Sequence, residues 1–152
     1  DSTKVSIIKN GILQVSRVVE IGGKYIDQSI LNFFEYTSEE LQQAKEGIQD
    51  ISHIDGKDQD YSRLVSIIKN AFDTLNERIE IIFRYYITRE MDNKIHTILL
   101  YGGSSNIGGL PNLFSNYFDI PSIKIESLDN VNFQGNMSKY INPIGSIIRL
   151  EV

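Results

Sequence analysis

The chain has 152 residues, no cysteine and a formal net charge of −5, from 15 Lys and Arg against 20 Asp and Glu. This length suffices for one domain with a hydrophobic core, or for one domain that carries a small subdomain. The lack of cysteine excludes a disulfide framework and a thiolate zinc site, and the negative charge argues against a general nucleic-acid-binding protein, which needs a basic surface.

Two β-rich segments open the chain. Residues 4–9 and 12–20 are rich in Val and Ile, and Asn10-Gly11 separates them. Asn-Gly is the residue pair that two-residue type I′ turns prefer, because both positions need a positive φ. We therefore predict a β-hairpin over residues 4–20.

A helix is predicted directly after the hairpin. Gly22-Gly23 ends the second strand, and apolar residues then recur at helical spacing from Tyr25 to Phe34. This pattern predicts an amphipathic helix over residues 24–35. Gly23 permits the bend between strand and helix whether or not a ligand lies beside it, so the local pattern leaves both interpretations open.

A second helix is predicted from the residues at its N-terminus. Residues 37–40 read Thr-Ser-Glu-Glu, which is typical of a capping box and predicts a helix over residues 38–48. Gln42 and Lys45 then share one face of this helix. A solvent-exposed charged face is the plain alternative for these residues and for Glu46.

Residues 49–60 are polar and acidic, and we predict a loop in a small inserted subdomain. Their spacing does not match an EF-hand calcium loop. No metal-ligating side chain stands four residues after His53 or His96, so we predict no metal site at either histidine.

One long helix is predicted over residues 61–90, where apolar residues repeat every three or four positions without Pro or Gly. At 1.5 Å per residue it would be roughly 45 Å long, enough to link an inserted subdomain to the main sheet. Its most apolar stretch, residues 79–87, contains Glu80 and Arg84 and is too short to span a bilayer.

A buried strand over residues 95–101, covered on both faces, is predicted to run into a glycine-rich turn and a helix. The glycine pairs 102–103 and 108–109 allow positive φ and close approach to a ligand, and the helix that follows presents unpaired N–H groups. A lone glycine-rich turn is a weak signal, so a nucleotide site and a tight turn without a ligand are equally open on this pattern.

After the glycine-rich turn, a helix, a short strand, a loop and a final helix are predicted in chain order. Apolar residues from Leu110 to Phe118 predict a helix that Asp119-Ile120-Pro121 ends. Residues 122–126 predict a short strand and residues 127–136 a loop, and Pro143 suits the first turn of a final helix.

Several of these segments resemble the actin-like ATPase superfamily. Residues 97–109 are similar to its adenosine motif, with Gly108-Gly109 where the superfamily has Pro-Gly. Three further segments resemble the PilM family of type IV pilus assembly proteins and the related FtsA division proteins: the hairpin with its Gly-Gly at 5–27, the helix at 38–45 and the closing helix at 142–149.

The resemblance implies an α/β fold of the ribonuclease-H-like kind, as the second half of an actin-like ATPase. Residues 1–36 and 91–152 would form its core sheet subdomain. Residues 37–90 would form an inserted subdomain and the long linking helix.

The resemblance also implies one wall of a nucleotide site. In the family, an acidic residue and a lysine at the positions of Gln42 and Lys45 contact the adenosine, so Gln42 departs from the pattern and implies weaker ATP binding. Glu46 would serve the ribose hydroxyls. The implied nucleotide-binding residues are Gly23, Gln42, Lys45, Glu46, Gly102, Gly103, Ser104 and Asn106.

In this family the segment before the hairpin is a strand ending in Asp-x-Gly, which faces the phosphates and the metal. Asp1-Ser2-Thr3 resembles only the tail of that loop. We therefore expect ATP with magnesium only in the complete protein. No catalytic residue is assigned, and no hydrolysis is expected from this chain alone, because phosphoryl transfer needs groups placed on several sides.

The implied role is that of a cytoplasmic scaffold for type IV pilus assembly in bacteria. It would be held at the inner membrane by the tail of a PilN-like protein and by other pilus assembly proteins, without nucleic acid or direct membrane insertion. The family's tail-binding groove lies mainly in the other half, so no residue here is assigned to it.

Two alternatives stay open. An FtsA-like division protein would end in a basic amphipathic helix, unlike the terminal sequence at 149–152. An interaction module of actin-like fold that has lost nucleotide binding is favoured by Gln42 and Gly108.

Overall fold

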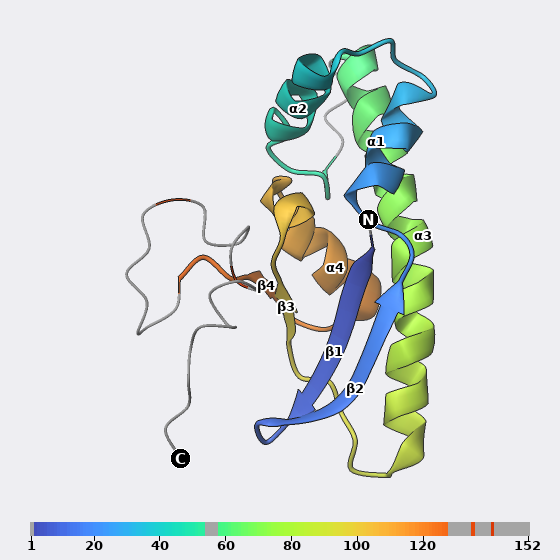
Figure 1. The fold of residues 1–152 in the computed structure, drawn as a ribbon, viewed down its shortest axis with the longest axis vertical. Helices are drawn as coiled ribbons and strands as arrows, with labels where there is room; N and C mark the ends of the chain where they lie inside the picture. Colours follow the sequence, from blue (N-terminus) through green and yellow to red (C-terminus); the bar gives the residue numbers. More distant parts are fainter. Residues whose placement is uncertain (1, 54–57, 128–134, 136–140, 142–152) are drawn as a thin grey trace.

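The computed structural model describes residues 2–53, 58–127, 135 and 141, and its fold is mixed α/β, as predicted (Figure 1). The expected loop at 127–136, except for residues 127 and 135, and the final helix at 142–149 lie outside the described residues. The elements in chain order are β1 (Thr3–Lys9), β2 (Ile12–Val19), α1 (Gly23–Leu31), α2 (Ser38–Glu46), α3 (Gln59–Arg89), β3 (Ile98–Leu100), the 3₁₀ helix η1 (Gly103–Asn106), α4 (Leu110–Phe118) and β4 (Ser122–Lys124).

The predicted hairpin is confirmed. Strands β1 and β2 pair antiparallel, and Asn10 and Gly11 at the turn have φ values of 53° and 75°. Both values lie in the region that a type I′ turn requires. A shift in register between Ile7 and Ile8 interrupts the ladder, and the buried face of the hairpin lies toward the core.

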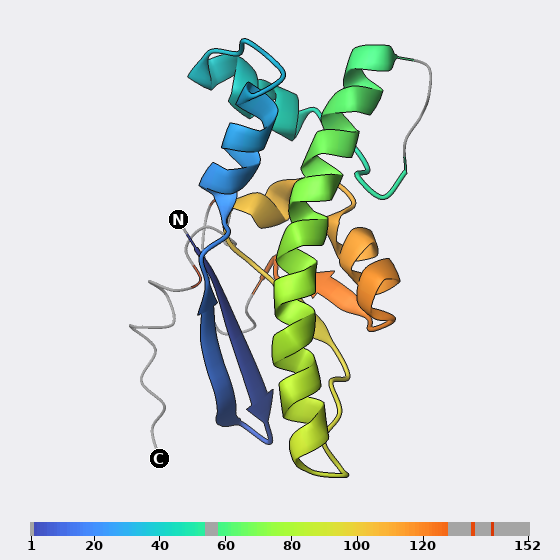
Figure 2. The same ribbon diagram turned by 90° about the vertical axis from the view of Figure 1, so that its right-hand side faces the viewer.

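The predicted long helix is also confirmed, as α3. Figure 2 shows it running along most of the molecule, with α1 beside its first half and the hairpin beside its second half. Phe83 packs on Phe118 of α4 with ring centroids 5.1 Å apart, and Phe72 meets Phe114 edge-on at 6.1 Å. None of the helices in the described parts of the chain combines the length and apolarity that crossing a bilayer requires.

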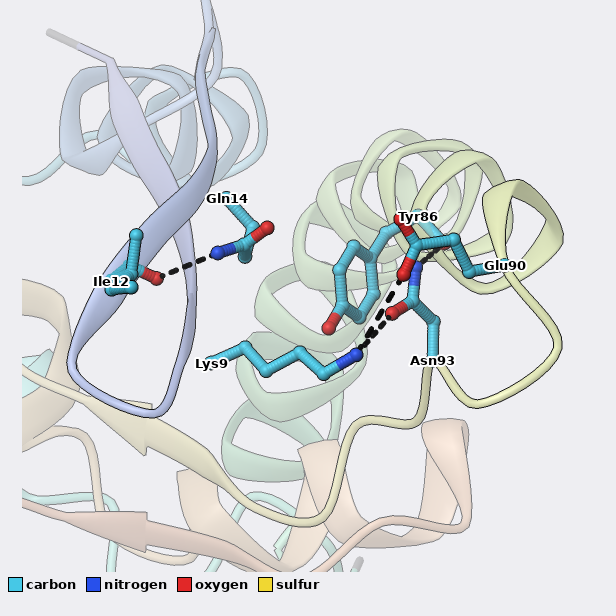
Figure 3. Close-up of polar contacts among 6 residues, drawn as sticks. All are labelled: Lys9, Ile12, Gln14, Tyr86, Glu90 and Asn93. Atoms are coloured by element: carbon cyan, nitrogen blue, oxygen red, sulfur yellow. Dashed lines mark hydrogen bonds and ion pairs between the residues drawn. The ribbon is translucent and has the colours of Figure 1, made fainter.

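The tip of the hairpin is tied to the end of α3 (Figure 3). Lys9 Nζ donates to Asn93 Oδ1 at 3.0 Å and lies 3.8 Å from Glu90 Oε2. Asn93 is 5% exposed, and its Nδ2 donates to the Tyr86 carbonyl at 2.9 Å. These contacts fix the hairpin against the helix at the end opposite to the glycine-rich turn.

Helix α1 ends at Leu31, four residues before the predicted end. The N–H of Phe34 bonds to the Ile30 carbonyl, and the chain then turns so that Phe34 stacks on Tyr36 with centroids 5.0 Å apart. The Arg63 guanidinium lies over Phe33 and Phe34. The apolar residues that extended the predicted helix therefore pack outside it, on one another and on a cation.

The prediction of a strand covered on both faces is wrong. Strand β3 has three residues and pairs parallel with β4, and among the described residues this pair and the hairpin are separate sheets. Leu99 is 55% exposed and its partner Ile123 is 53% exposed. Because α4 packs on one side only, the other face of this pair stays open among the described elements.

The predicted capping box generates a test of stability against pH. Thr37 N and Oγ1 each donate to Glu40 Oε2 at 2.8 Å, and Glu40 N donates back to Thr37 Oγ1. The bond from the Thr37 backbone, then that from its hydroxyl, lowers the pKa of Glu40 from its usual 4.5. Since the folded-state pKa is the lower one, this contribution to stability is present above about pH 4.5 and is lost as the pH falls through the folded-state pKa.

We expect Glu40→Gln to lower the urea midpoint at pH 7, and the difference from wild type to shrink and then disappear as the pH falls below about 4.5 and through the folded-state pKa. Glu39→Gln is the matched control, because it removes the same charge from the same helical turn outside the capping box. Equal loss of pH dependence in both variants would contradict the capping-box account.

Candidate functional site

A pocket of about 240 Å³ lies between α1, α2 and η1. Every nucleotide-binding residue implied by the sequence lines it except Gly102, although these residues come from segments far apart in the chain. Its lining consists of Gly23, Ile26, Asp27, Gln42, Lys45, Glu46, Gly103, Ser104, Asn106 and Ile107.

The α2 wall is polar and organised by side-chain bonds. Lys45 Nζ lies 2.6 Å from Asp27 Oδ1 of α1, and the Gln42 amide donates to the Glu46 carboxylate one helical turn away. Lys45 and Asp27 have side-chain exposures of 19% and 32%, so water screens this ion pair less than it screens a surface pair. The predicted common face of Gln42 and Lys45 is confirmed.

The opposite wall is built from the start of α1 and from η1. A Cβ on Gly23 would lie 3.5 Å from Ser104 Oγ, which is ordinary van der Waals contact, so packing does not require glycine there. A Cβ on Gly103 would meet nothing within 4 Å. The Gly103 carbonyl accepts a bond from Asn106 Nδ2 at 3.1 Å. These small residues leave the pocket open on this side.

Gly102 serves the turn and does not line the pocket. Its φ of 102° lies in the region that favours glycine. Its carbonyl accepts bonds from Ser105 N at 3.2 Å and from Ser105 Oγ at 2.7 Å. These bonds belong to η1, which separates strand β3 from helix α4 in the chain.

Three lining residues were missed by the sequence analysis: Ile26, Asp27 and Ile107. Ile26 and Ile107 are 3% and 6% exposed and form an apolar part of the lining. Asp27 follows Gly23 by four positions, the spacing that places residues on one helix face. That spacing could have indicated Asp27 once Gly23 was placed at the pocket.

Of the two interpretations left open for the glycine-rich turn, the packing of Gly108 and Gly109 favours a tight turn, and neither residue lines the pocket. The Gly108 carbonyl accepts a bond from Ile51 N at 2.9 Å, and a Cβ on Gly108 would overlap the carbonyl oxygens of Ile48 and Gln49. Gly109 has a φ of 74°. Both glycines therefore pack the turn against the loop after α2.

Asp50 belongs to the same contact, because a Cβ on Gly109 would overlap its carboxylate. Ser52 Oγ and N donate to Asp50 Oδ1 at 2.6 Å and 2.8 Å. The Ser52 hydroxyl, then its backbone N–H, lowers the pKa of Asp50 from its usual 3.8. The loop is thus held in shape by its own bonds where the glycines press on it.

The pocket combines two apolar side chains, one ammonium and two carboxylates with exposed backbone at a turn. Such a lining suits a small polar molecule with a flat apolar part and hydroxyl groups. Within the described residues there is no group of three or more His, Cys, Asp or Glu side chains that could hold a metal ion.

The packing of the turn generates a paired prediction. Gly108→Ala should lower the free energy of unfolding by about 2 kcal/mol, because its methyl group must displace backbone. Gly103→Ala should change it by less than about 0.5 kcal/mol, because its methyl group enters open space. Urea unfolding of both variants measures the difference, and equal costs would show that the two glycines have been assigned wrongly.

Residues 1–142 match the family described as type IV pilus assembly protein PilM. In structure, the chain is similar to a solved chain of a "PilM-PilN type IV pilus biogenesis complex", with a TM-score of 0.64 and 16% identity. The likeness covers 82% of this chain and 32% of that chain, so this chain spans about a third of its length. No curated protein matches the chain in sequence.

Proposed function

Since the chain belongs to the PilM family of type IV pilus assembly proteins, we propose that its pocket binds the adenosine part of an adenine nucleotide. One observation carries the proposal: the residues that resemble the superfamily's nucleotide motifs lie apart in sequence, and the fold gathers them around one hollow. A tight turn that binds no ligand would not require the residues of α1 and α2 to line a common pocket with the turn.

Each part of the pocket suits one part of the nucleotide. Ile26 and Ile107 offer apolar contact to the base. The carboxylate of Glu46 can accept bonds from ribose hydroxyls. The start of α1 at Gly23 brings helix N–H groups to the pocket, which favours a phosphate on that side.

The pocket is large enough to hold only part of a nucleotide. At about 240 Å³ it is smaller than the ~300–1,000 Å³ of typical small-molecule sites. We therefore propose that the complete protein supplies further contacts to the nucleotide. We assign no magnesium ligand to the described residues and no hydrolysis to this chain, since phosphoryl transfer needs charge neutralisation from several sides.

For the cellular role, we propose a scaffold in type IV pilus assembly. The similar solved structure is titled as a PilM–PilN complex, which supports a PilN-like inner-membrane protein as partner. A cytoplasmic location at the inner membrane follows from that partner. Residues 1–36 with 91–152, and residues 37–90, are proposed as the core and the inserted subdomain.

We expect Gly103→Val in the full-length protein to weaken ATP binding at least about tenfold, because its side chain would enter the space proposed for the ligand. The fold should persist, since nothing lies within 4 Å of the added Cβ. Isothermal titration calorimetry measures the affinity, and a thermal melt checks the fold.

The control is Ser29→Val, which adds the same side chain to α1 in a separate hollow toward α3. It should keep wild-type affinity. Unchanged ATP affinity in Gly103→Val would overturn the proposed site, and a wild-type protein that binds no ATP would favour an interaction module without nucleotide chemistry.

A further inference from the structure

The ion pair between Asp27 and Lys45 joins the two helices that wall the pocket. Lys45 Nζ lies 2.6 Å from Asp27 Oδ1, and both residues line the hollow. Both side chains are partly buried, so solvent screens this pair less than it screens an exposed surface pair. Asp27 therefore determines where the Lys45 ammonium lies and how much of its charge a ligand meets.

The charge balance of this wall is negative. Asp27 and Glu46 contribute two carboxylates against the single ammonium of Lys45 among the lining residues. A phosphate placed here would face two like charges and a cation that is already paired. Hydroxyl groups meet no such penalty, because they donate to carboxylates and accept from ammonium.

We propose that Asp27 is a specificity-determining residue of the pocket: by pairing with Lys45, it makes the α2 wall accept the hydroxyl groups of a nucleoside and reject its phosphates. This inference rests on the proposed function and deepens it. Specificity of this kind depends on repulsion of the wrong group as much as on attraction of the right one.

The test compares two ligands in the full-length protein. Adenosine and ATP are titrated in the same magnesium-containing buffer, and the ratio of their dissociation constants is taken for each variant. Asp27→Asn keeps the shape of the side chain but leaves the Lys45 charge unpaired. We expect the ratio to shift toward ATP by about fivefold, with a steeper salt dependence of ATP binding.

If Asp27 had only a structural role, Asp27→Asn would weaken the binding of adenosine and of ATP to the same degree and leave the ratio unchanged. Glu35→Gln is the control for net charge, because Glu35 is exposed and lies outside the pocket. It should keep the wild-type ratio. Asp27→Glu keeps the negative charge beside Lys45 and should hold the ratio within about twofold, so a shift confined to Asp27→Asn comes from the lost charge.

An unchanged ratio in Asp27→Asn, or a ratio in Asp27→Glu shifted as far as in Asp27→Asn, would overturn the inference while leaving the proposed nucleotide site intact. Failure of the wild-type protein to bind either ligand would overturn the proposed function and this inference with it.

Discussion

The structure depends on one close backbone contact, where the glycine-rich turn meets the loop after α2. Ile51 N donates to the Gly108 carbonyl, and no side chain at Gly108 separates the turn from the carbonyls of Ile48 and Gln49. This contact sets the distance between α2 and η1, which are opposite walls of the pocket. If α2 and η1 lay farther apart, the pocket between them would become open surface. A methyl group at Gly108 would push the turn and the loop after α2 apart in this way.

The other contacts hold this arrangement from both ends. At one end, the Asp27–Lys45 pair joins α1 to α2 across the pocket. At the other end, Lys9 and Asn93 fix the hairpin to the end of α3, which carries the core between them. The chain thus places polar contacts at both ends of this arrangement and apolar packing along α3 between them. The proposed nucleotide site lies where α1, α2 and the turn converge, away from the hairpin tip.

Local signals in the sequence predicted the elements that depend on local interactions. Asn10-Gly11 identified the hairpin because a two-residue turn needs positive φ at both positions, and Thr37 with Glu40 identified the start of α2 because the bonds lie within one turn. The early end of α1 was missed, since the apolar pattern counts Phe33 and Phe34 without showing that they pack on Arg63. The role of Gly108 depends on a neighbour 60 positions away in sequence, Ile48, which no local pattern contains. For the site, resemblance supplied most of the lining, and Asp27 required the helix geometry.

The most direct measurement is amide hydrogen exchange of the full-length protein with and without ATP. If ATP binds in the pocket, protection increases in the segments that line it, residues 23–31, 38–46 and 103–107, and does not change at the hairpin tip around Asn10. The proposed site is contradicted if saturating ATP adds no protection in those three segments. It is also contradicted if protection is confined to the separate hollow between α1 and α3.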